Sequence, residues 1–600
     1  MIKKKRPEKK IDIIEMAIIA NRFDGIVREM SNTLLRAARS TVISSCRDFS
    51  CCIVTSDHEL VASGEGLPVH IFGAHLQTKH LAKIHAKDTA PGDAYLDNDP
   101  YGGNSHPADH AIIVPVFING EILFYGVVKA HMADIGNSIP SSYSPRARDV
   151  YEEGSLTFPA VRIQRAYKNE DDIIRMCRAR IRVPEQWYGD YLATLGAARI
   201  AEKRLTELCA KYGRKKTQQF LKEWFDHSER RMADAIRALP KARVVNTGAS
   251  DPLENILPKG LTLKVILDID PKRGIIRADL RNNPPSVECG LNVSRAAAMS
   301  SVSAGIFNNL HNVPRNAGSF RRLVFSFAEN CVIGSPLFPH SCSTATTNLA
   351  ERLVNITQSA FAQLGDGFGL AEGGTGLGAG QAVVSGIDHR YKKRYVNRIM
   401  ISNNGGPATP TSDGWINYGM PIISGLMYRD SVEIDELKHP FLIGRVGIVR
   451  DSAGAGEFRG APAQEIVYAT RKNPMTVVIP CDGQFAPPRG VRGGKNGAAG
   501  TTFKYNRLGK EKRLPNVTTV ILKKGEFIRG RDGSGGGYGN PLRRDPKRVL
   551  NDVREGIESV KKASKVYGVA FSGSIDTDDL IVDTVATNSL RTSLLRRKSR

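Results

Sequence analysis

The chain has 600 residues, too many for a single hydrophobic core, so we expect about two to four domains. Its composition, with 41% hydrophobic and 24% charged residues, is typical of a soluble globular protein. No run of about 18 apolar residues occurs, which argues against a membrane-spanning segment.

The net charge of +24 could indicate a nucleic-acid surface, an anionic membrane or an acidic partner. The excess is spread out, with local runs at Lys3–Lys10, Arg214–Lys216 and Arg596–Arg600. No nucleic-acid-binding module accompanies these runs, so we expect solvated faces and disordered tails, and neither nucleic acid nor a membrane as partner. The nine cysteines form no C-x-x-C pair and no secretory signal is present, which predicts a cytoplasmic protein without a zinc ribbon or redox motif.

The first predicted element is a long amphipathic helix over residues 11–43. Its apolar residues recur on one face at helical spacing: Phe23, Ile26, Val27, Met30, Leu34 and Ala38. A strand is expected over Cys51–Thr55, and the turn at Ser56–His58 predicts a hairpin. His70 and His75 precede a helix expected over residues 76–86, and we interpret both as packed histidines at a helix entry.

The most distinctive stretch is Asn98–His110, which contains two Gly, two Pro, two His and two Asp. His106 and Asp109 lie there, just before the apolar run 111–117, and His131 follows a second apolar run, 122–128. Two such turns can converge on one point, which is how a metal site with nitrogen and oxygen ligands is built. The alternative is that these side chains only cap strand ends by bonding their own backbone.

The rest of the chain predicts an α+β multidomain protein. A polar loop at Pro140–Arg148, of the kind that forms lids or binding walls, precedes a mostly helical stretch over residues 169–239. A hairpin follows at residues 261–280, then buried helices at 295–312 and 346–364, Gly-rich short strands at 365–500 and a helix at 543–567. We therefore predict an N-terminal mixed α/β metal-binding domain (1–240), a strand-rich, Gly-rich middle α+β domain (241–470), and a C-terminal β-rich region with final helices (471–600).

Glycine-rich segments raise the question of a phosphate-binding loop. The chain contains no G-x-x-x-x-G-K-[ST] motif, so a P-loop is absent. Gly374–Ala379 fits a dinucleotide fingerprint only nominally, because no good strand precedes it. Gly533–Gly539 could wrap backbone amides around an anion, but we expect a flexible loop before the final helix. Cys51 lies in an apolar neighbourhood and is expected to be inert.

Several motifs, in order, resemble the B-type subunit of the hydantoinase B/oxoprolinase family, which is related to the metal-bearing subunits of acetone and acetophenone carboxylases. The family pattern N-D-P-Y-x-G-G-x-H-x-x-D matches Asn98–Asp109, except that Asn104 stands where the second Gly is expected. The patterns R-D-F-S-C, H-x-A-D-I-G and Y-x-E-G match Arg47–Cys51, His131–Gly136 and Tyr151–Gly154. The resemblance extends from about Asn21 to Leu595.

The resemblance implies a set of site residues. Asp48, His106, Asp109 and His131 match the family positions that bind a divalent metal, and this donor set suits zinc or manganese, with iron as a further option. Asp134, three residues after His131, is a candidate catalytic residue that moves protons or orients a ligand; its alternative role is to cap the turn before Gly136. Tyr101, Tyr143 and Tyr151 are candidates for lining the pocket.

Two enzymatic hypotheses follow from the resemblance. In the first, the chain is the metal-bearing subunit of an ATP-dependent amidohydrolase of cyclic amides such as hydantoin, 5-oxoproline or a lactam. In the second, it is the metal-bearing subunit of an ATP-dependent ketone carboxylase. Both require a hetero-oligomer in which ATP is bound by an A-type subunit, which phosphorylates the small carbonyl substrate. We favour hydrolysis, because the loop at Ser138–Pro145 is polar and wettable. A third, non-enzymatic hypothesis, a structural or nucleic-acid-binding role explaining the +24 charge, ranks last.

Overall fold

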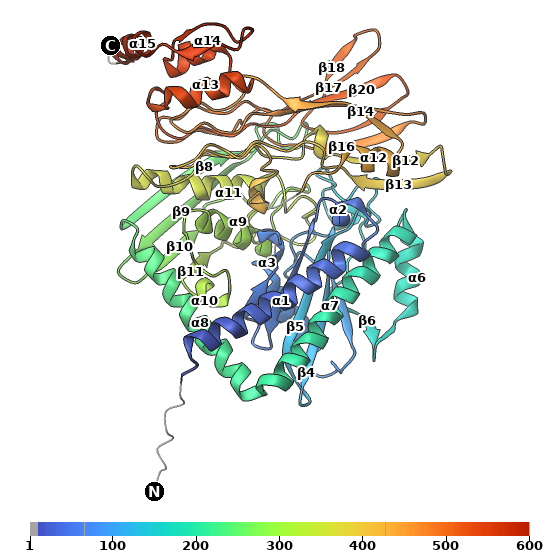
Figure 1. The fold of residues 1–600 in the computed structure, drawn as a ribbon. Coiled ribbons are helices and arrows are strands. Elements are labelled where there is room, and N and C mark those ends of the chain that lie inside the picture. Colours follow the sequence, from blue (N-terminus) through green and yellow to red (C-terminus); the bar gives the residue numbers. More distant parts are fainter. Residues whose placement is uncertain (1–9, 65, 426–427, 599–600) are drawn as a thin grey trace.

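The computed structural model describes residues 10–64, 66–425 and 428–598, so most of the predicted basic tail at Lys3–Lys10 lies outside the described residues. Figure 1 shows a multidomain α+β architecture, with helices and one large sheet at the N-terminal end of the molecule and strand-rich layers at the other. The predicted fold class is confirmed. The exact domain boundaries at residues 240 and 470 remain predictions.

The N-terminal half is built on a seven-stranded sheet with the order β2-β1-β5-β4-β3-β6-β7. The strands are β1 (Phe49–Thr55), β2 (Leu60–Ser63), β3 (Ala94–Asp97), β4 (Asp109–Ile118), β5 (Glu121–His131), β6 (Val161–Arg165) and β7 (Lys168–Asn169). The two apolar runs that flank the predicted site therefore form the antiparallel neighbours β4 and β5. The hairpin predicted at Ser56–His58 joins β1 to β2.

Long helices cover this sheet, and α1 packs along α7 (Figure 1). The helices are α1 (Ile13–Ala37), α2 (Thr41–Ser44), α3 (Pro68–Ile71), α4 (Ala74–Ile84), α5 (Val150–Glu153), α6 (Asp171–Arg180), α7 (Pro184–Tyr212) and α8 (Arg214–Arg237). The single helix predicted over residues 11–43 is broken after Ala37, because Ala38 is extended and the next two amides donate to the carboxylate of Asp190. That tertiary contact is invisible to local periodicity.

A second sheet, with the order β11-β10-β9-β8, carries the middle of the chain. It contains β8 (Ala242–Ala249), β9 (Thr262–Asp270), β10 (Ile275–Asp279) and β11 (Leu323–Ser326), so the hairpin predicted at residues 261–280 is confirmed. The buried helices expected here are also present, as α9 (Arg295–Phe307) and α11 (Leu349–Ala360), with the short α10 (Ala317–Phe320) between them. The N-terminus of α11 follows a buried loop that reaches the candidate site.

Two further sheets and the final helices complete the fold. One sheet has the order β13-β12-β16-β19 and the other β14-β15-β20-β17-β18. Their strands are β12 (Val383–Asp388), β13 (Lys393–Arg398), β14 (Phe441–Ile448), β15 (Gln464–Thr470), β16 (Met475–Pro480), β17 (Thr501–Asn506), β18 (Glu511–Arg513), β19 (Val517–Leu522) and β20 (Glu526–Arg531). The remaining elements are α12 (Val432–Lys438), α13 (Pro546–Arg554), α14 (Val560–Lys562), β21 (Phe571–Ser572), β22 (Ile581–Val582) and α15 (Thr584–Lys598). Short 3-10 helices lie at Phe361–Leu364, Ala379–Gln381, Pro421–Ile423 and Pro541–Arg543, with a π turn at Ala563–Tyr567.

The glycine cluster at Gly533–Gly539 is not the flexible loop that its composition suggested. The segment is buried, and a Cβ added at Gly535 would lie 1.7 Å from the carbonyl oxygen of Gly406. The glycines are therefore required for close backbone packing between strand-poor segments of the C-terminal half. The same holds for Gly376 in the other cluster, where an added Cβ would lie 2.0 Å from the amide nitrogen of Asp482.

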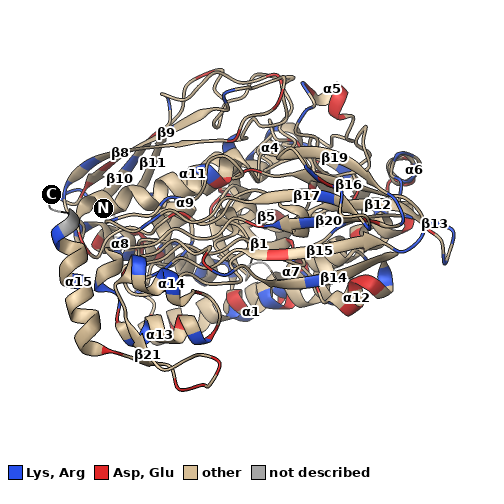
Figure 2. Cartoon of the chain, turned by 90° about the horizontal axis from the view of Figure 1, so that it is seen from above, with Lys and Arg blue, Asp and Glu red and all other residues tan. Residues whose placement is uncertain are grey.

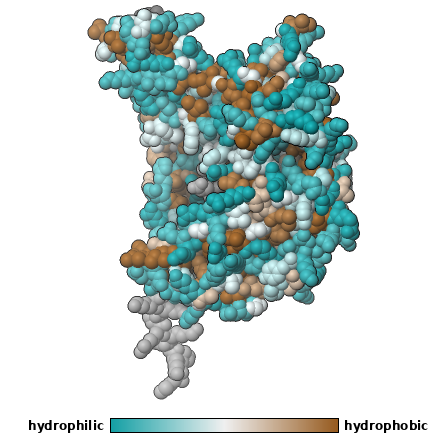
Figure 3. Space-filling model, turned by 45° about the vertical axis from the view of Figure 1, so that its right-hand side comes forward, coloured by the Kyte–Doolittle hydropathy of each residue, from teal (hydrophilic) through white to brown (hydrophobic). Residues whose placement is uncertain are grey.

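The charged and the hydrophobic residues are both distributed over the molecule. Figure 2 shows Lys and Arg scattered over helices and strands in all parts of the chain. On the face in Figure 3, hydrophobic residues form separate patches among hydrophilic ones. Among the described residues, no helix combines the length and the apolar character that a membrane crossing requires.

Candidate metal centre

Three neighbouring interior strands of the large sheet, β4, β5 and β1, bring the predicted site residues together at one end of the strands. Asp109, the first residue of β4, is the register partner of His131, the last residue of β5. Asp48 directly precedes β1, which pairs with β5, and its carbonyl accepts the amide of His131 at 3.0 Å. His106 reaches the same point from the turn before β4. Strand pairing thus brings His106, Asp109 and His131 into one group, and the side chain of Asp48 lies beside that group but outside it.

Asp109 lies at the centre of this cluster. Its Oδ1 is 3.0 Å from Nε2 of His106 and 3.2 Å from Nδ1 of His131. One ligand atom from each of the three side chains lies within 4.8 Å of the other two, and all three residues are buried. Metal–ligand bonds of about 2.0–2.2 Å place adjacent ligand atoms about 3–3.5 Å apart, so these separations suit a shared ion.

The turn before β4 fixes the direction of His106. The Nδ1–H of His106 donates to the carbonyl of Ser343 at 2.9 Å, which leaves Nε2 directed at Asp109. Asn104, the departure from the family pattern, donates its amide to the carbonyls of His106 and Asp109 at 2.7 and 2.8 Å. It does this without the left-handed conformation, which Gly103 adopts instead with φ of +113°. Such partners orient a metal-binding imidazole.

The loop predicted as a binding wall closes the other side of the cluster. Ser142 lies 2.9 Å from Nε2 of His131, and the buried ring of Tyr143 packs against the rings of His106 and His131, with centroids 5.6 and 5.3 Å away. Burial, followed by the charges of Asp48, Asp109 and Glu351, raises the pKa of Tyr143 although Arg398 opposes this. Tyr143 is therefore a neutral phenol at the cluster. Tyr151, by contrast, is exposed on the surface.

The pKa shifts of Asp109 and His131 favour the forms that bind metal, whereas the shift of His106 favours its protonated form in the metal-free chain. Burial opposes ionisation of Asp109, but the neighbouring imidazoles of His106 and His70 outweigh it, and its pKa lies well below the ordinary value. Burial lowers the pKa of His131. Burial also acts to lower the pKa of His106, but Asp109 and the Ser343 carbonyl outweigh it and raise that pKa. An ionised carboxylate and a neutral imidazole are the forms that bind metal ions.

A third imidazole, which sequence reasoning assigned to packing, also reaches the cluster. Nε2 of His70, on α3, lies 3.1 Å from Oδ2 of Asp109 and 3.8 Å from Oδ1 of Asp48. Its Nδ1 lies 3.3 Å from the hydroxyl of Ser50, which also accepts the amide of Leu67 at 2.8 Å. The only local signal was a histidine just after the proline that starts a short helix, which is also what a packed histidine shows.

Asp48 has a second partner from the distant β13. Its Oδ2 accepts a hydrogen bond from the guanidinium of Arg398 at 2.5 Å, and both side chains are buried. Its other oxygen faces His70. Arg398 also lies over the ring of Tyr143, with 5.8 Å between the guanidinium carbon and the ring centroid. Residues of the middle region therefore complete the site built on the N-terminal sheet.

The candidate catalytic residue Asp134 lies apart from these contacts. Its carboxylate accepts the backbone amide of Arg182 at 2.5 Å, forms an ion pair with the guanidinium of Arg182 at 3.0 Å, and accepts the amide of Gly136 at 3.2 Å. These contacts favour the alternative role, a cap on the turn before Gly136. A catalytic role for Asp134 stays a prediction.

A cavity and a buried carboxyl group near the cluster could serve a substrate. A cavity of about 600 Å³ is bordered by the loop residues Ser138, Ile139 and Ser144–Ala147 on one side and by β16 and β19 on the other.

Glu351, at the start of α11, is buried; one carboxyl oxygen accepts the amide of Gly376 at 2.5 Å, and the other has no hydrogen-bond partner among the described residues. Burial raises the pKa of Glu351 to about 8.

Cys51 follows its prediction. It is buried in β1, and burial raises the pKa of its thiol to about 12, so it stays protonated and unreactive near neutral pH.

Comparison with known proteins agrees with the fold. The family model described as hydantoinase B/oxoprolinase matches residues 12–541. The chain is 28% identical to the beta subunit of the caprolactamase of Pseudomonas jessenii, over 95% of this chain and 98% of that protein. It is 27% identical to the B subunit of a putative D-/L-hydantoinase of Pseudomonas sp. (strain NS671), over 97% and 98%.

A carboxylase subunit and a solved structure are also similar. The acetophenone carboxylase delta subunit of Aromatoleum aromaticum is 23% identical over 92% of this chain and 86% of that subunit. The crystal structure of the ATP-dependent caprolactamase from Pseudomonas jessenii superposes with a TM-score of 0.87 at 27% identity, covering 97% of this chain and 100% of that chain.

Proposed function

Because the chain belongs to the hydantoinase B/oxoprolinase family, we propose that it is the metal-bearing B subunit of a two-subunit, ATP-dependent hydrolase of cyclic amides. The observation that carries the proposal is the buried group of His106, Asp109 and His131 at the ends of the interior strands β4 and β5. Two relatives that cover nearly the whole chain, a caprolactamase subunit and a hydantoinase subunit, support a ring amide as the substrate class.

The proposed metal ligands are Asp48, His106, Asp109 and His131. The donor set of imidazoles and carboxylates, with no thiolate, suits zinc or manganese, or iron. His70 lies close enough to Asp109 to join them. A divalent metal bound there supplies Lewis acidity, which polarises a carbonyl oxygen or lowers the pKa of water.

The protein groups around the cluster have separate tasks in this proposal. The carbonyl of Ser343 orients His106, and Arg398 orients Asp48 by holding one of its oxygens. The ring of Tyr143 covers the two imidazoles and keeps bulk water off that side, while its neutral hydroxyl can donate to a developing negative charge. The loop at residues 138–147 links this inner wall to the cavity through which a small carbonyl compound would enter.

The partner in this proposal is an A-type subunit that binds ATP. It transfers a phosphoryl group to the amide oxygen, which makes the ring carbon electrophilic. Water then adds to that carbon at the cluster, and the ring carbon–nitrogen bond breaks as a proton is delivered to the nitrogen. A second water hydrolyses the resulting acyl phosphate, which releases phosphate and leaves a carboxylate. The absence of a P-loop from this sequence is in keeping with ATP binding by the partner.

Ketone carboxylation is the second candidate, favoured by the similarity to an acetophenone carboxylase subunit. It would use the same cluster, but an enolate must be shielded from protons until it meets CO2. Buried serine hydroxyls in the wall, Ser141, Ser142 and Ser144, make this side of the site polar, and for that reason we rank hydrolysis first.

One reconstitution tests both candidates. The chain is combined with an A-type subunit of the same family and ATP, and phosphate release is measured with a lactam, with a hydantoin, and with a ketone plus bicarbonate. We expect ATP consumption with a cyclic amide, and none by the isolated chain. Bicarbonate-dependent consumption on the ketone alone would reverse the ranking. Substrate-dependent ATP hydrolysis by the pure isolated chain would overturn the two-subunit proposal.

A further inference from the structure

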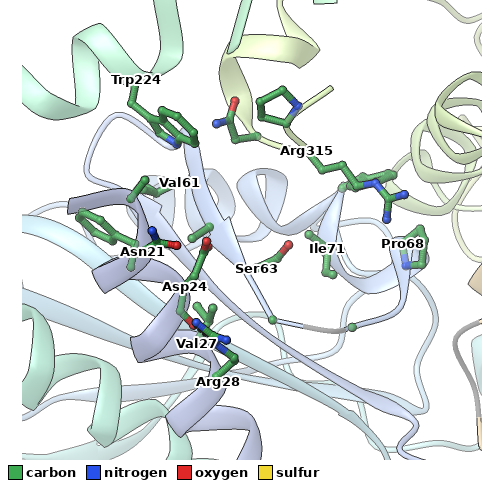
Figure 4. A pocket seen from close by; sticks show the side chains of 18 of the residues that line it. Asn21, Asp24, Val27, Arg28, Val61, Ser63, Pro68, Ile71, Trp224 and Arg315 are labelled. Carbon is green, nitrogen blue, oxygen red and sulfur yellow. Dashed lines mark hydrogen bonds between the residues drawn. The ribbon is translucent and has the colours of Figure 1, made fainter. Parts of the chain in front are cut away.

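A second cavity, of about 620 Å³, is lined in part by Pro68 and Ile71 of α3, the helix that also carries His70 (Figure 4). Its walls come from α1, from the end of β2, from α3, from Trp224 of α8 and from residues 313–316. None of the proposed metal ligands lines it. The cavity is therefore distinct from the site described above.

The floor of this cavity is apolar. It is formed by Phe23, Val27, Val61, Ile71, Phe72, Trp224, Val313 and Pro314. Trp224 is held in place by stacking on Phe220 and His227, with ring centroids 6.2 and 5.6 Å away. A floor of this kind takes up the hydrocarbon part of a small molecule.

The rim of the cavity carries charged side chains. Among its described lining residues the charged side chains are Asp24, Arg28 and Arg315, which leaves an excess of one positive charge. Figure 4 shows Arg315 on one side of the cavity and Asp24 and Arg28 of α1 on the other. The hydrogen bond formed by Arg28 goes to the backbone carbonyl of Asp24, at 3.3 Å. Neither arginine forms an ion pair with a carboxylate among the described residues.

We propose that this cavity binds a small carboxylate with an apolar chain, its charged end at Arg315 and its hydrocarbon part on the floor beside Trp224. A guanidinium pairs with a carboxylate through two parallel hydrogen bonds, which gives such a site its preference for an anion. Asp24 on the same rim disfavours a second negative charge on the ligand. The expected ligand is therefore a monoanion.

The close packing around α3 explains why the two sites stay separate. A Cβ added to Gly66, which lines the cavity, would lie 2.6 Å from the hydroxyl of Ser50, and Ser50 contacts His70. Pro68 and Ile71 of α3 face the cavity, whereas His70 faces Asp109. A bound carboxylate would thus lie behind the imidazole, not against the metal ligands.

Binding is tested on the full-length chain with hexanoate as the probe, by calorimetry and by the emission of Trp224. We expect saturable binding at about millimolar concentration, which is typical for a ligand of this size. Added salt should weaken it, since the attraction is partly electrostatic. Hexylamine, which has the same chain and the opposite charge, should not compete, and inorganic phosphate, which lacks the chain, should compete poorly.

Three variants make the test specific. Arg315→Gln should weaken hexanoate binding at least about tenfold, in keeping with the loss of charge-assisted hydrogen bonds. Arg22→Gln, an exposed position on the same helix that lines a different cavity, should leave binding unchanged. Trp224→Phe should abolish the emission change and keep the calorimetric signal. Binding is compared only between variants whose thermal unfolding matches that of the parent chain.

The proposal is wrong if hexanoate shows no saturable binding. It is also wrong if hexylamine binds as well as hexanoate, or if the Arg315→Gln variant binds like the parent chain. These results do not depend on the metal centre or on the A-type subunit, so they leave the proposed function untouched.

Discussion

Arg398 of β13 donates to the carboxylate of Asp48 at 2.5 Å, so two buried residues that are 350 positions apart in the chain form one ion pair. The pair holds one oxygen of Asp48 away from the cluster and leaves the other facing His70. It also places a strand from the second half of the chain against the N-terminal sheet. The candidate metal centre is consequently completed only when both halves are folded together.

Arg398→Met should destabilise the metal-free chain by about 3–5 kcal/mol, because it leaves the carboxylate of Asp48 buried without its cation. Urea unfolding followed by Trp fluorescence measures this. The double variant Asp48→Asn/Arg398→Met should recover much of the loss, because no buried charge is left. Equal losses in the single and the double variants would show that packing at Arg398, rather than its charge, is responsible.

Metal content should depend on the cluster in a graded way. His106→Ala and His131→Ala should each lose the ion, because both imidazoles lie within the group centred on Asp109. His70→Ala should keep most of it, since His70 approaches the other oxygen of Asp109 and lies outside that group. Elemental analysis of purified protein measures the content, with about one divalent ion expected per parent chain. Full occupancy in both the His106 and the His131 variants would refute the proposed site.

Asp134→Asn should retain the metal and slow turnover of the reconstituted enzyme. The contacts of Asp134 predict that Arg182→Met causes a similar loss of turnover, because both changes loosen the same turn after His131. Turnover and metal content are measured on the same preparations. A metal-free Asp134→Asn protein would instead identify Asp134 as a ligand. A strong loss in Asp134→Asn alone, with Arg182→Met active, would favour a direct catalytic role.

Local sequence was sufficient where the site depends on a turn and its adjoining strands. The apolar runs at 111–117 and 122–128 predicted strands, and their antiparallel pairing places Asp109 opposite His131. His106 follows from its position three residues earlier. The same reasoning predicted the hairpin of β9 and β10.

Tertiary contacts decided what local sequence could not. Arg398 carries no local signal, because only the packing of β13 against α2 and the cluster gives it a role. His70 has the same neighbours in sequence whether it packs or binds. The glycines at Gly533–Gly539 suggested mobility by composition, yet their lack of side chains serves dense backbone packing. A glycine-rich composition is compatible with either a mobile loop or dense packing, and the tertiary contacts of the segment decide between them.

Glu351→Gln should change how stability depends on pH. Burial raises the pKa of Glu351 to about 8, from an ordinary value of 4.5. The folded state therefore favours the protonated carboxyl: its contribution is fully present below pH 4.5 and is lost as the pH rises through about 8. The glutamine variant keeps an oxygen that can accept the amide of Gly376 and has no proton to lose.

Three charged groups act on Glu351: Asp482 raises its pKa, and Arg352 and Arg398 lower it. The charge of Glu351 in turn raises the pKa values of Tyr143 and Tyr418. All of them are present in both proteins, so the comparison isolates the carboxyl. Relative to the parent, the variant should gain up to about 1.4 kcal/mol for each pH unit between the two pKa values and no more above them. Urea unfolding at pH 5, 6.5, 8 and 9 measures the difference. Glu254→Gln, at an exposed side chain, should show no such trend. A difference that is independent of pH would mean that Glu351 is ionised in the folded chain, with a partner for its second oxygen.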